Sequence, residues 1–290
     1  MERLGALRAR LASLAQLAEV VGAMRALAAM RLQQAAALRE GAGRYAEIVA
    51  AALSQAVLLA GPAPSVIRPR RPALLLFAAE HGFVGSYAEG LARAAVAASV
   101  PELYVVGARG ARLLDELGRP ARWAVSMTPH AAGIPALARR LAAGLVERLT
   151  AGAFTELVTM FGSLERGGGW RVATRALLPP DFRRFRAPPA CVPPLSHLPP
   201  RRLLDAVVGE YLLADLVHAA TESLAAENAA RLRAMAAAAD NIDRRLDELR
   251  AQERVLRQEQ ITDELLDVLN GAEALRAKGE GGSAALTSTC

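Results

Sequence analysis

The chain has 290 residues, of which 53% are hydrophobic, 22% charged and only 4% aromatic, and its formal net charge is +6. This composition supplies enough apolar side chains for one large or two smaller folded domains, and it excludes both a disordered and a collagen-like chain. The two cysteines, Cys191 and Cys290, are too few for a disulfide framework and lack metal-ligand spacing, so we expect a protein of the reducing cytosol without a metal site.

The first predicted element is a long helix over residues 1–60. Large apolar side chains recur there every three or four residues, and the first proline is Pro62. The recurring positions are Leu4, Leu7, Leu11, Leu14, Leu17, Val21, Met24 and Leu27. At about 1.5 Å per residue this helix would be roughly 80 Å long. Such a length without helix caps indicates a coiled coil.

Neither a secretory signal nor a membrane span is expected. Charged side chains at Glu2, Arg3, Arg8 and Arg10 interrupt the N-terminal residues, which is not typical of a signal peptide. Apolar runs such as PALLLFAA at Pro72 are far shorter than the roughly 20 residues that a spanning helix needs.

Prolines mark residues 61–72 as a linker, and an α/β domain is predicted over residues 73–190. The short apolar runs ALLLFAA, ELYVVG, ELVTMFG and WRVATRALLP read as strands, and helical stretches lie between them. Strands that alternate with helices indicate an open, Rossmann-like α/β sheet. The glycines of ERGGGW indicate a hairpin-type turn before the last strand.

A second proline-rich linker is predicted at 191–200, followed by another long helix over 201–276. Apolar side chains keep helical spacing from Leu204 to Leu269 without an intervening proline, which gives a rod roughly 110 Å long. Its stretch from Met235 to Asp240 is nearly all alanine, which favours helix but adds little width. Residues 277–290 lack periodicity and are expected to form a mobile tail.

The predicted fold class is therefore α/β with long helices. The N- and C-terminal helices are expected to pair as an antiparallel coiled coil that buries both apolar stripes, with the open α/β sheet domain inserted between them. Because the C-terminal helix is the longer one, its end must extend past its partner. A lone helix is marginally stable in water, so we expect another protein to surround that end.

Three stretches of the two long helices resemble the gamma subunit of F-type ATP synthase. They are AMRALAAMRLQQA in the first helix, and ENAARLRAMAAAADN and LRQEQITDELLDVLNGAEAL in the last. The order of helix, α/β insert and helix is also similar, so the resemblance covers nearly the whole chain. A thin, alanine-rich stretch is what a shaft turning inside a narrow sleeve requires.

The resemblance implies a central rotor shaft. Such a shaft couples ion flow through the membrane c-ring to ATP synthesis or hydrolysis in the hexamer of alpha and beta subunits. The implied partners are the alpha, beta and epsilon subunits and the c-ring, at the cytoplasmic face of the bacterial inner membrane. The implied chain is not an enzyme and binds no cofactor, since ATP chemistry takes place on the beta subunits.

The resemblance also indicates which residues meet the beta subunits. The candidates are Met24, Arg25, Glu227, Arg231, Arg257, Gln258, Thr262 and Glu264. Glu227 and Arg231 are one helical turn apart, so the alternative reading is a solvated pair within the helix. Arg257 and Gln258 can donate hydrogen bonds to carboxylates of a beta loop. For the residues near the C-terminal tip the alternative is an exposed polar face.

The loop after the first strand departs from this family. AAEHGFVGSYAEG stands where most members carry a Cys-Gly-Gly-type sequence, and only Gly82 and Gly85 keep part of the turn. This departure suggests the divergent, N-ATPase-like branch of alternative F-type ATPases. The glycine spacing fits neither the dinucleotide fingerprint nor a P-loop. Glu80 and His81 could form an acid/base pair, but no nucleophile or second carboxylate accompanies them.

Two other function classes remain open on the residues alone. One is an enzyme or nucleotide-binding module built on the α/β domain, with the helices as oligomerisation arms. The other is a helical nucleic-acid binder, which the net charge of +6 suggests. The basic residues of the long helices alternate with acidic ones, so no stripe of one sign forms, and nucleic acid is not an expected partner.

Overall fold

The structure is a computed structural model that describes residues 2–61, 69–180 and 195–284, with side chains between residues 3 and 272. The chain divides into two units, one formed by Met1–Ala23 with Ala237–Cys290 and the other by Met24–Ala236. The first unit contains only helix, and the second contains the sheet. Cys191, Cys290 and parts of both predicted linkers lie outside the described residues.

Two long helices account for both ends of the chain. Helix α1 spans Glu2–Ala60 and helix α5 spans Pro200–Ala284. The predicted tail at 277–290 is corrected in its first part, because α5 continues to Ala284. No proline stops the helical hydrogen-bond ladder there, and a glycine costs only about 1 kcal/mol relative to alanine.

The buried seam of α1 follows a repeat of seven residues. The buried side chains at this spacing are Leu7, Val21, Ala28, Ala35, Ala42, Val49 and Ala56. Leu17 and Leu27, which the sequence places on the buried stripe, are 47% and 42% exposed. A strict heptad selects a narrower seam than the three-or-four spacing of leucines, and it is the pattern of a left-handed coiled coil.

Helix α1 also contains an 18-residue window with a mean hydropathy of 1.3, so by length and composition alone it could cross a membrane. Only 11% of that window is buried in the structure. Length and composition do not separate a spanning helix from an alanine-rich coiled-coil helix. The heptad of buried positions favours the coiled coil.

The two long helices run antiparallel in each unit. In the second unit, Tyr45 of α1 donates a hydrogen bond to Glu210 of α5, and Arg39 of α1 pairs with Glu222 further along α5. In the first unit, Nε of Arg8 donates to Glu253 over 2.9 Å. Residue numbers fall along α1 as they rise along α5, which confirms the predicted antiparallel coiled coil.

The second unit holds a five-stranded sheet in the order β3-β2-β1-β4-β5. The strands are β1 (Pro72–Phe77), β2 (Glu102–Val106), β3 (Trp123–Val125), β4 (Glu156–Leu164) and β5 (Trp170–Leu178). The first four pair in parallel, and β5 pairs antiparallel with β4. This confirms the predicted α/β sheet. The short strand β3 was not expected, because a run of three apolar residues is too short to indicate a strand.

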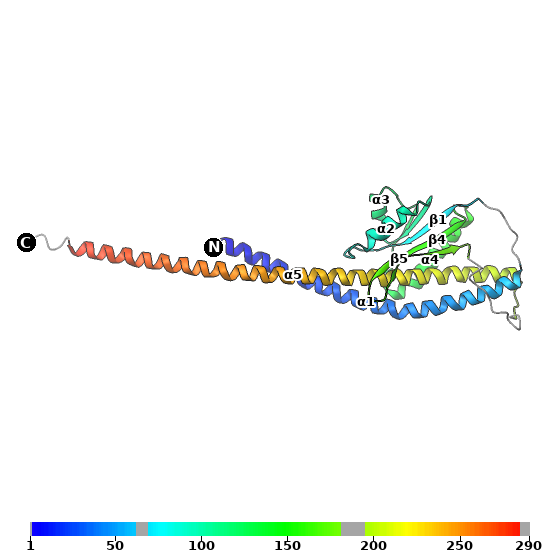
Figure 1. The fold of residues 1–290 in the computed structure, drawn as a ribbon, viewed down its shortest axis with the longest axis horizontal. Coiled ribbons are helices and arrows are strands. Elements are labelled where there is room, and N and C mark those ends of the chain that lie inside the picture. Colours follow the sequence, from blue (N-terminus) through cyan, green and yellow to red (C-terminus); the bar gives the residue numbers. More distant parts are fainter. Residues whose placement is uncertain (1, 62–68, 181–194, 285–290) are drawn as a thin grey trace, which may run out of the picture. The chain divides into compact units, whose positions relative to one another are not determined.

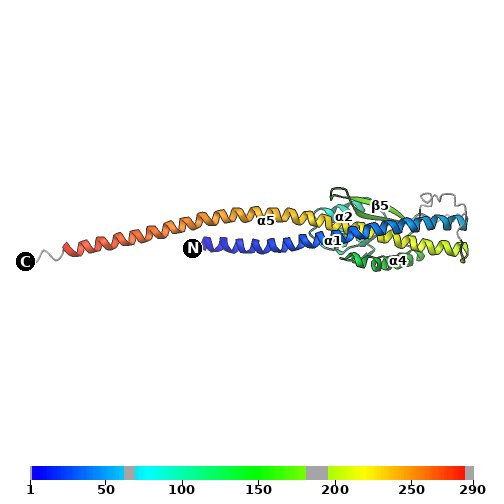
Figure 2. The same ribbon diagram turned by 90° about the horizontal axis from the view of Figure 1, so that it is seen from below.

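Helices cover both faces of this sheet (Figure 1). On one face lie α2 (Tyr87–Ala97) and α3 (Ala108–Glu116), which pack against Leu74 and Leu76 of β1. On the other face lie α4 (Ile134–Thr150), preceded by the short 3-10 helix η1 (Ala131–Gly133), and a stretch of α5 (Figure 2). Because β1 is buried on both faces, its sequence is a continuous apolar run.

The stretch of α5 from Ala219 to Arg231 is buried at every residue. It packs on the sheet through side chains such as Leu224 and Ala226, and Ala35 of α1 belongs to the same core. Six of these thirteen residues are alanines, which lets neighbouring elements approach on all sides. The stretch also carries buried polar side chains, and these organise the candidate site.

Candidate functional site

A groove of about 440 Å³ lies in the second unit, between α1, the loop after β1 and α5. Its lining includes Met24, Leu27, Arg31, His81, Phe83 and Arg231. Met24 is half-buried and the neighbouring candidate Arg25 is exposed. Phe83 holds a positive φ of 62° and leaves 66% of its surface exposed. The fold thus brings Met24 and Arg231 to one groove, although they are far apart in the sequence.

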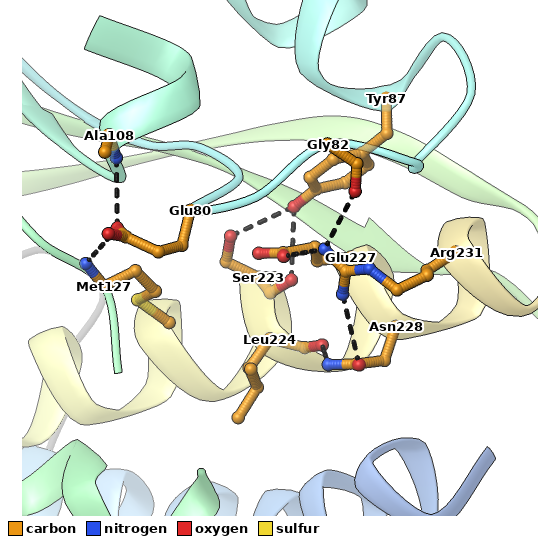
Figure 3. A network of polar contacts seen from close by, with 10 residues as sticks. All are labelled: Glu80, Gly82, Tyr87, Ala108, Met127, Ser223, Leu224, Glu227, Asn228 and Arg231. Atoms are coloured by element: carbon orange, nitrogen blue, oxygen red, sulfur yellow. Dashed lines mark hydrogen bonds and ion pairs between the residues drawn. The ribbon is translucent and has the colours of Figure 1, made fainter. Parts of the chain in front are cut away.

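Glu227 and Arg231 form an ion pair inside the protein (Figure 3). Nη2 of Arg231 lies 2.6 Å from Oε1 of Glu227, and the two side chains are 7% and 5% exposed. Nη1 of Arg231 also donates to Oδ1 of Asn228 over 3.3 Å, and Nη2 reaches the carbonyl of Gly82 at 3.5 Å. One guanidinium therefore connects α5 with the loop after β1.

This burial corrects the reading of Glu227 and Arg231 as a solvated pair. Burial raises the pKa of the Glu227 carboxyl above its ordinary value, and the Arg231 guanidinium acts in the opposite direction. Both side chains point to partners within the chain rather than to solvent. They are therefore residues that hold the groove together and not an exposed contact surface.

A second polar contact joins α5 to the first helix of the α/β domain. The buried hydroxyl of Tyr87, at the start of α2, donates to the carbonyl of Ser223 over 3.1 Å and lies 3.0 Å from its Oγ. Burial raises the pKa of the Tyr87 phenol, so the group stays a hydrogen-bond donor. Oγ of Ser223 lies 3.4 Å from the carbonyl of Phe77, the last residue of β1.

The remaining candidates lie in the other unit, on the C-terminal part of α5. Arg257 is 57% exposed and pairs with Glu253 over 3.0 Å. Gln258, Thr262 and Glu264 are also exposed. Thr262 donates to the Gln258 carbonyl over 2.9 Å, and Glu264 accepts from Gln260 over 2.8 Å. These contacts lie within one turn of α5, as in the alternative interpretation of an exposed polar face.

Large apolar side chains surround these polar residues. They are exposed by half or more of their surface at Val255, Ile261, Leu265, Leu266, Val268 and Leu269. Ile261, Leu265 and Val268 follow helical spacing, so they form an apolar face on this part of α5. Exposed apolar surface of this extent marks an interaction site.

At the carboxyl edge of the parallel sheet, Glu80 fills the position where α/β domains usually bind a ligand. Its Oε2 accepts from the backbone N–H of Ala108 over 3.0 Å and from that of Met127 over 2.7 Å (Figure 3). Ala108 is the first residue of α3, whose N-terminus attracts negative charge. The acid/base reading of Glu80 with His81 is thereby corrected, because the carboxylate is held by the backbone.

Gly107 makes this arrangement possible. Its φ is 118°, and a Cβ there would lie 2.5 Å from the carbonyl oxygen of Ala78. Only glycine fits such a conformation and such a close approach. The backbone N–H groups of Arg109 and Gly110, in the first turn of α3, both donate hydrogen bonds to the carbonyl of Ala79.

Sequence reasoning missed the polar partners of α5 within its own chain. Ser223, Asn228 and Tyr87 gave no signal, since single polar residues in a helical pattern read as surface positions. A weak signal was available in the spacing of Glu222, Glu227 and Arg231 on a helix otherwise rich in alanine. Among the residues that the structure describes, no group of three His, Cys, Asp or Glu side chains could hold a metal ion.

Comparison with known proteins identifies what this arrangement is similar to. The family described as ATP synthase matches residues 3–275 of the chain. The ATP synthase gamma chain of Parafrankia sp. is 27% identical over 286 residues, which cover 92% of this chain and 96% of the relative.

Chains from solved structures of mitochondrial ATP synthase share this fold. The rotor of Euglena gracilis mitochondrial ATP synthase matches with a TM-score of 0.63 and 12% identity, over 90% of this chain and 99% of that one. A chain of the OSCP/F1/c-ring structure of the same enzyme matches with a TM-score of 0.67 and 14% identity, over 96% of both chains. At these identities the likeness shows the fold.

Proposed function

Because this chain belongs to the ATP synthase family, we propose that it is the gamma subunit, the central shaft of an F-type ATP synthase rotor. The shaft couples ion flow through the membrane c-ring to ATP synthesis or hydrolysis in the surrounding alpha and beta subunits. The chain itself performs no bond chemistry in this proposal. It is a peripheral protein at the cytoplasmic face of the bacterial inner membrane.

The observation that carries this proposal is the apolar face at the C-terminal part of α5. Ile261, Leu265 and Leu269 are each more than half exposed, although they are among the largest apolar side chains of the helix. An isolated helix with such a face is not stable in water. A sleeve of alpha and beta subunits would remove that face from water and stabilise the helix.

The exposed polar residues of the same stretch are the proposed contacts to beta loops. Arg257 and Gln258 carry donors suited to carboxylates, and Thr262 and Glu264 lie one to two turns further along. In the second unit, Met24 and Arg25 present a half-buried thioether and an exposed guanidinium beside the groove. Glu227 and Arg231 support that groove from inside.

The α/β domain is proposed as the foot that contacts the epsilon subunit and the c-ring. The alternative is an enzyme or nucleotide-binding domain with helical arms. Its ligand would bind at the carboxyl edge of the sheet, and Glu80 already occupies that place. A phosphate at the N-terminus of α3 would compete with a carboxylate already bound there by two backbone N–H groups. No specific observation favours that alternative.

The test is a reconstitution of this chain with alpha, beta and the membrane sector. We expect co-purification with three alpha and three beta subunits and ATP-driven ion pumping into vesicles. Deletion after Leu256 should leave the α/β domain folded and reduce the ions pumped per ATP hydrolysed. Full pumping by the deleted chain, or failure of the intact chain to bind alpha and beta subunits, would contradict the proposal.

A further inference from the structure

A second polar cluster lies on α5 of the second unit, about two and a half to four and a half turns before Arg231. Asp215, His218 and Glu222 are three and four residues apart, so they share one face of the helix. Asp215 is 1% exposed and pairs with Arg175 of β5 over 2.9 Å. This cluster is separate from the groove at Met24.

Glu222 contacts two other elements. Its side chain is 5% exposed, and its Oε1 accepts a hydrogen bond from Nε of Arg39 in α1. Its Oε2 accepts from Oγ of Ser163 in β4 over 3.0 Å. One carboxylate thus joins α1, α5 and the sheet, and we call Glu222 with Arg39 and Ser163 the Glu222 junction.

Around the Glu222 junction, α5 packs mostly through small side chains. Alanines occupy positions 219, 220, 225 and 226 of α5, and all four are buried. A helix surface of small side chains lacks the large knobs that lock one element against another. Large side chains such as Leu216 and Leu224 are few in this stretch, so directional, charge-assisted hydrogen bonds contribute much of what fixes the rotation of α5 against α1 and the sheet.

The neighbouring residues complete a cluster with balanced charge. Arg175 and Arg39 contribute positive charge, and Asp215 and Glu222 contribute negative charge. His218 lies between the two acids, with its ring edge-on to Phe161 of β4 at a centroid distance of 6.1 Å. Burial of ion pairs does little for stability, and their best-attested role is to select one arrangement of the packed elements.

We infer that the Glu222 junction fixes the rotational setting of α5 against α1 and the sheet, so that twist of the α/β domain passes to the shaft without slippage. This inference rests on the proposed rotor function. Glu222 is a positioning residue here, since it acts through the elements that it joins. The Asp215–Arg175 pair is a second connection of the same kind, between α5 and β5.

The experiment compares four forms of the chain in the complete reconstituted complex. The double variant Glu222→Met with Arg39→Met replaces the pair by apolar side chains of similar size. Glu222→Gln keeps an acceptor for Arg39. The control is Glu40→Gln with Arg44→Gln, which removes the exposed ion pair of α1 at 3.1 Å. The readouts are melting temperature, ATP hydrolysis, ions pumped per ATP and the torsional stiffness of single rotating complexes.

We expect the double variant to melt within about 4 °C of the unchanged chain and to hydrolyse ATP. Its torsional stiffness should fall by about half if the Glu222 junction and the Asp215–Arg175 pair contribute similarly and additively, and ions pumped per ATP should fall with it. Glu222→Gln keeps one acceptor and loses the charge, so its stiffness should lie between those of the double variant and the unchanged chain, and the control variant should match the unchanged chain. Unchanged stiffness and pumping in the double variant would overturn the inference.

Two further outcomes keep the inference separate from the proposed function. If the unchanged chain does not support pumping, the rotor proposal itself fails. If the double variant does not assemble, Ser163→Ala replaces it, because that change removes one hydrogen bond of the Glu222 junction and leaves the ion pair. Lower stiffness with Ser163→Ala would support the inference, and unchanged stiffness would overturn it.

Discussion

Two stretches of the same helix α5 have opposite surroundings. From Ala219 to Arg231 every residue is buried, yet only Leu224 is a large apolar side chain. From 261 to 272 every residue is exposed, yet the stretch contains five large apolar side chains. Buried polar groups and exposed apolar groups are the informative exceptions to ordinary burial.

The difference shows which part of α5 has its packing partners within its own chain. The polar groups of the buried stretch find partners in the loop after β1, in α1, in α2 and in the sheet. The apolar side chains of the exposed stretch are expected to pack against another protein. The following predictions test this contrast, in order of decreasing effect on the free energy of unfolding of the isolated chain.

The largest loss in the free energy of unfolding is expected for Arg231→Met. Removal of the guanidinium leaves the Glu227 carboxylate buried without its counter-charge, which costs about 3–5 kcal/mol. Chemical unfolding of the isolated chain measures the loss. Because protonation neutralises Glu227, the variant should recover part of its stability as the pH falls. Arg233→Met, an exposed position two residues away, should change little.

A smaller loss is expected for Tyr87→Phe. The substitution keeps the ring and removes the hydroxyl that donates to Ser223, so the buried carbonyl loses a donor at a cost of about 1–3 kcal/mol. Thermal unfolding followed by circular dichroism measures it. A Tyr87→Phe chain as stable as the unchanged one would show that this contact does not hold α5 to α2.

His218→Gln should change how the stability of the folded chain depends on pH more than it changes the stability at neutral pH. Burial lowers the pKa of the His218 imidazole in the folded chain, so the unfolded chain binds the proton more readily. The stability associated with the neutral imidazole is present above the unfolded pKa of about 6.5 and is lost as the pH falls below it. Melting temperatures between pH 7 and 5 should therefore decline less steeply in the variant, and an equally steep decline would contradict the prediction.

The smallest effect on folding is expected for Leu265→Asp with Leu269→Asp. Both side chains are exposed, so the free energy of unfolding of the isolated chain should change by about 0.5 kcal/mol or less. Binding to alpha and beta subunits should nevertheless be lost, because two charges would enter the apolar face. A clear drop in the melting temperature of the isolated chain would show that this face packs within the chain itself.

The sequence was sufficient for the elements and their order. Helical spacing without proline predicts both long helices, and the alternation of apolar runs with helical stretches predicts the α/β sheet. The strand β3 was not predicted, because Trp123–Val125 is only three residues long. The exposed end of α5 follows from the unequal lengths of the two helices, which can be counted in the sequence.

The inner connections could not be predicted because they join residues far apart in the chain. Arg231 contacts the carbonyl of Gly82, 149 residues away, and Glu80 accepts from Met127, 47 residues away. Neither contact leaves a periodic trace in the sequence. Burial of Glu227 likewise depends on what the loop after β1 covers, and not on the helix that carries it.

Glu80 has a consequence for the carboxyl edge of the sheet. Domains of this architecture often bind a phosphate-bearing ligand at this edge. Here the required negative charge is part of the polypeptide and is present from the moment of folding. The carboxylate ties the loop after β1 to the start of α3 and to the segment after β3, so the domain needs no bound anion to hold these three segments together.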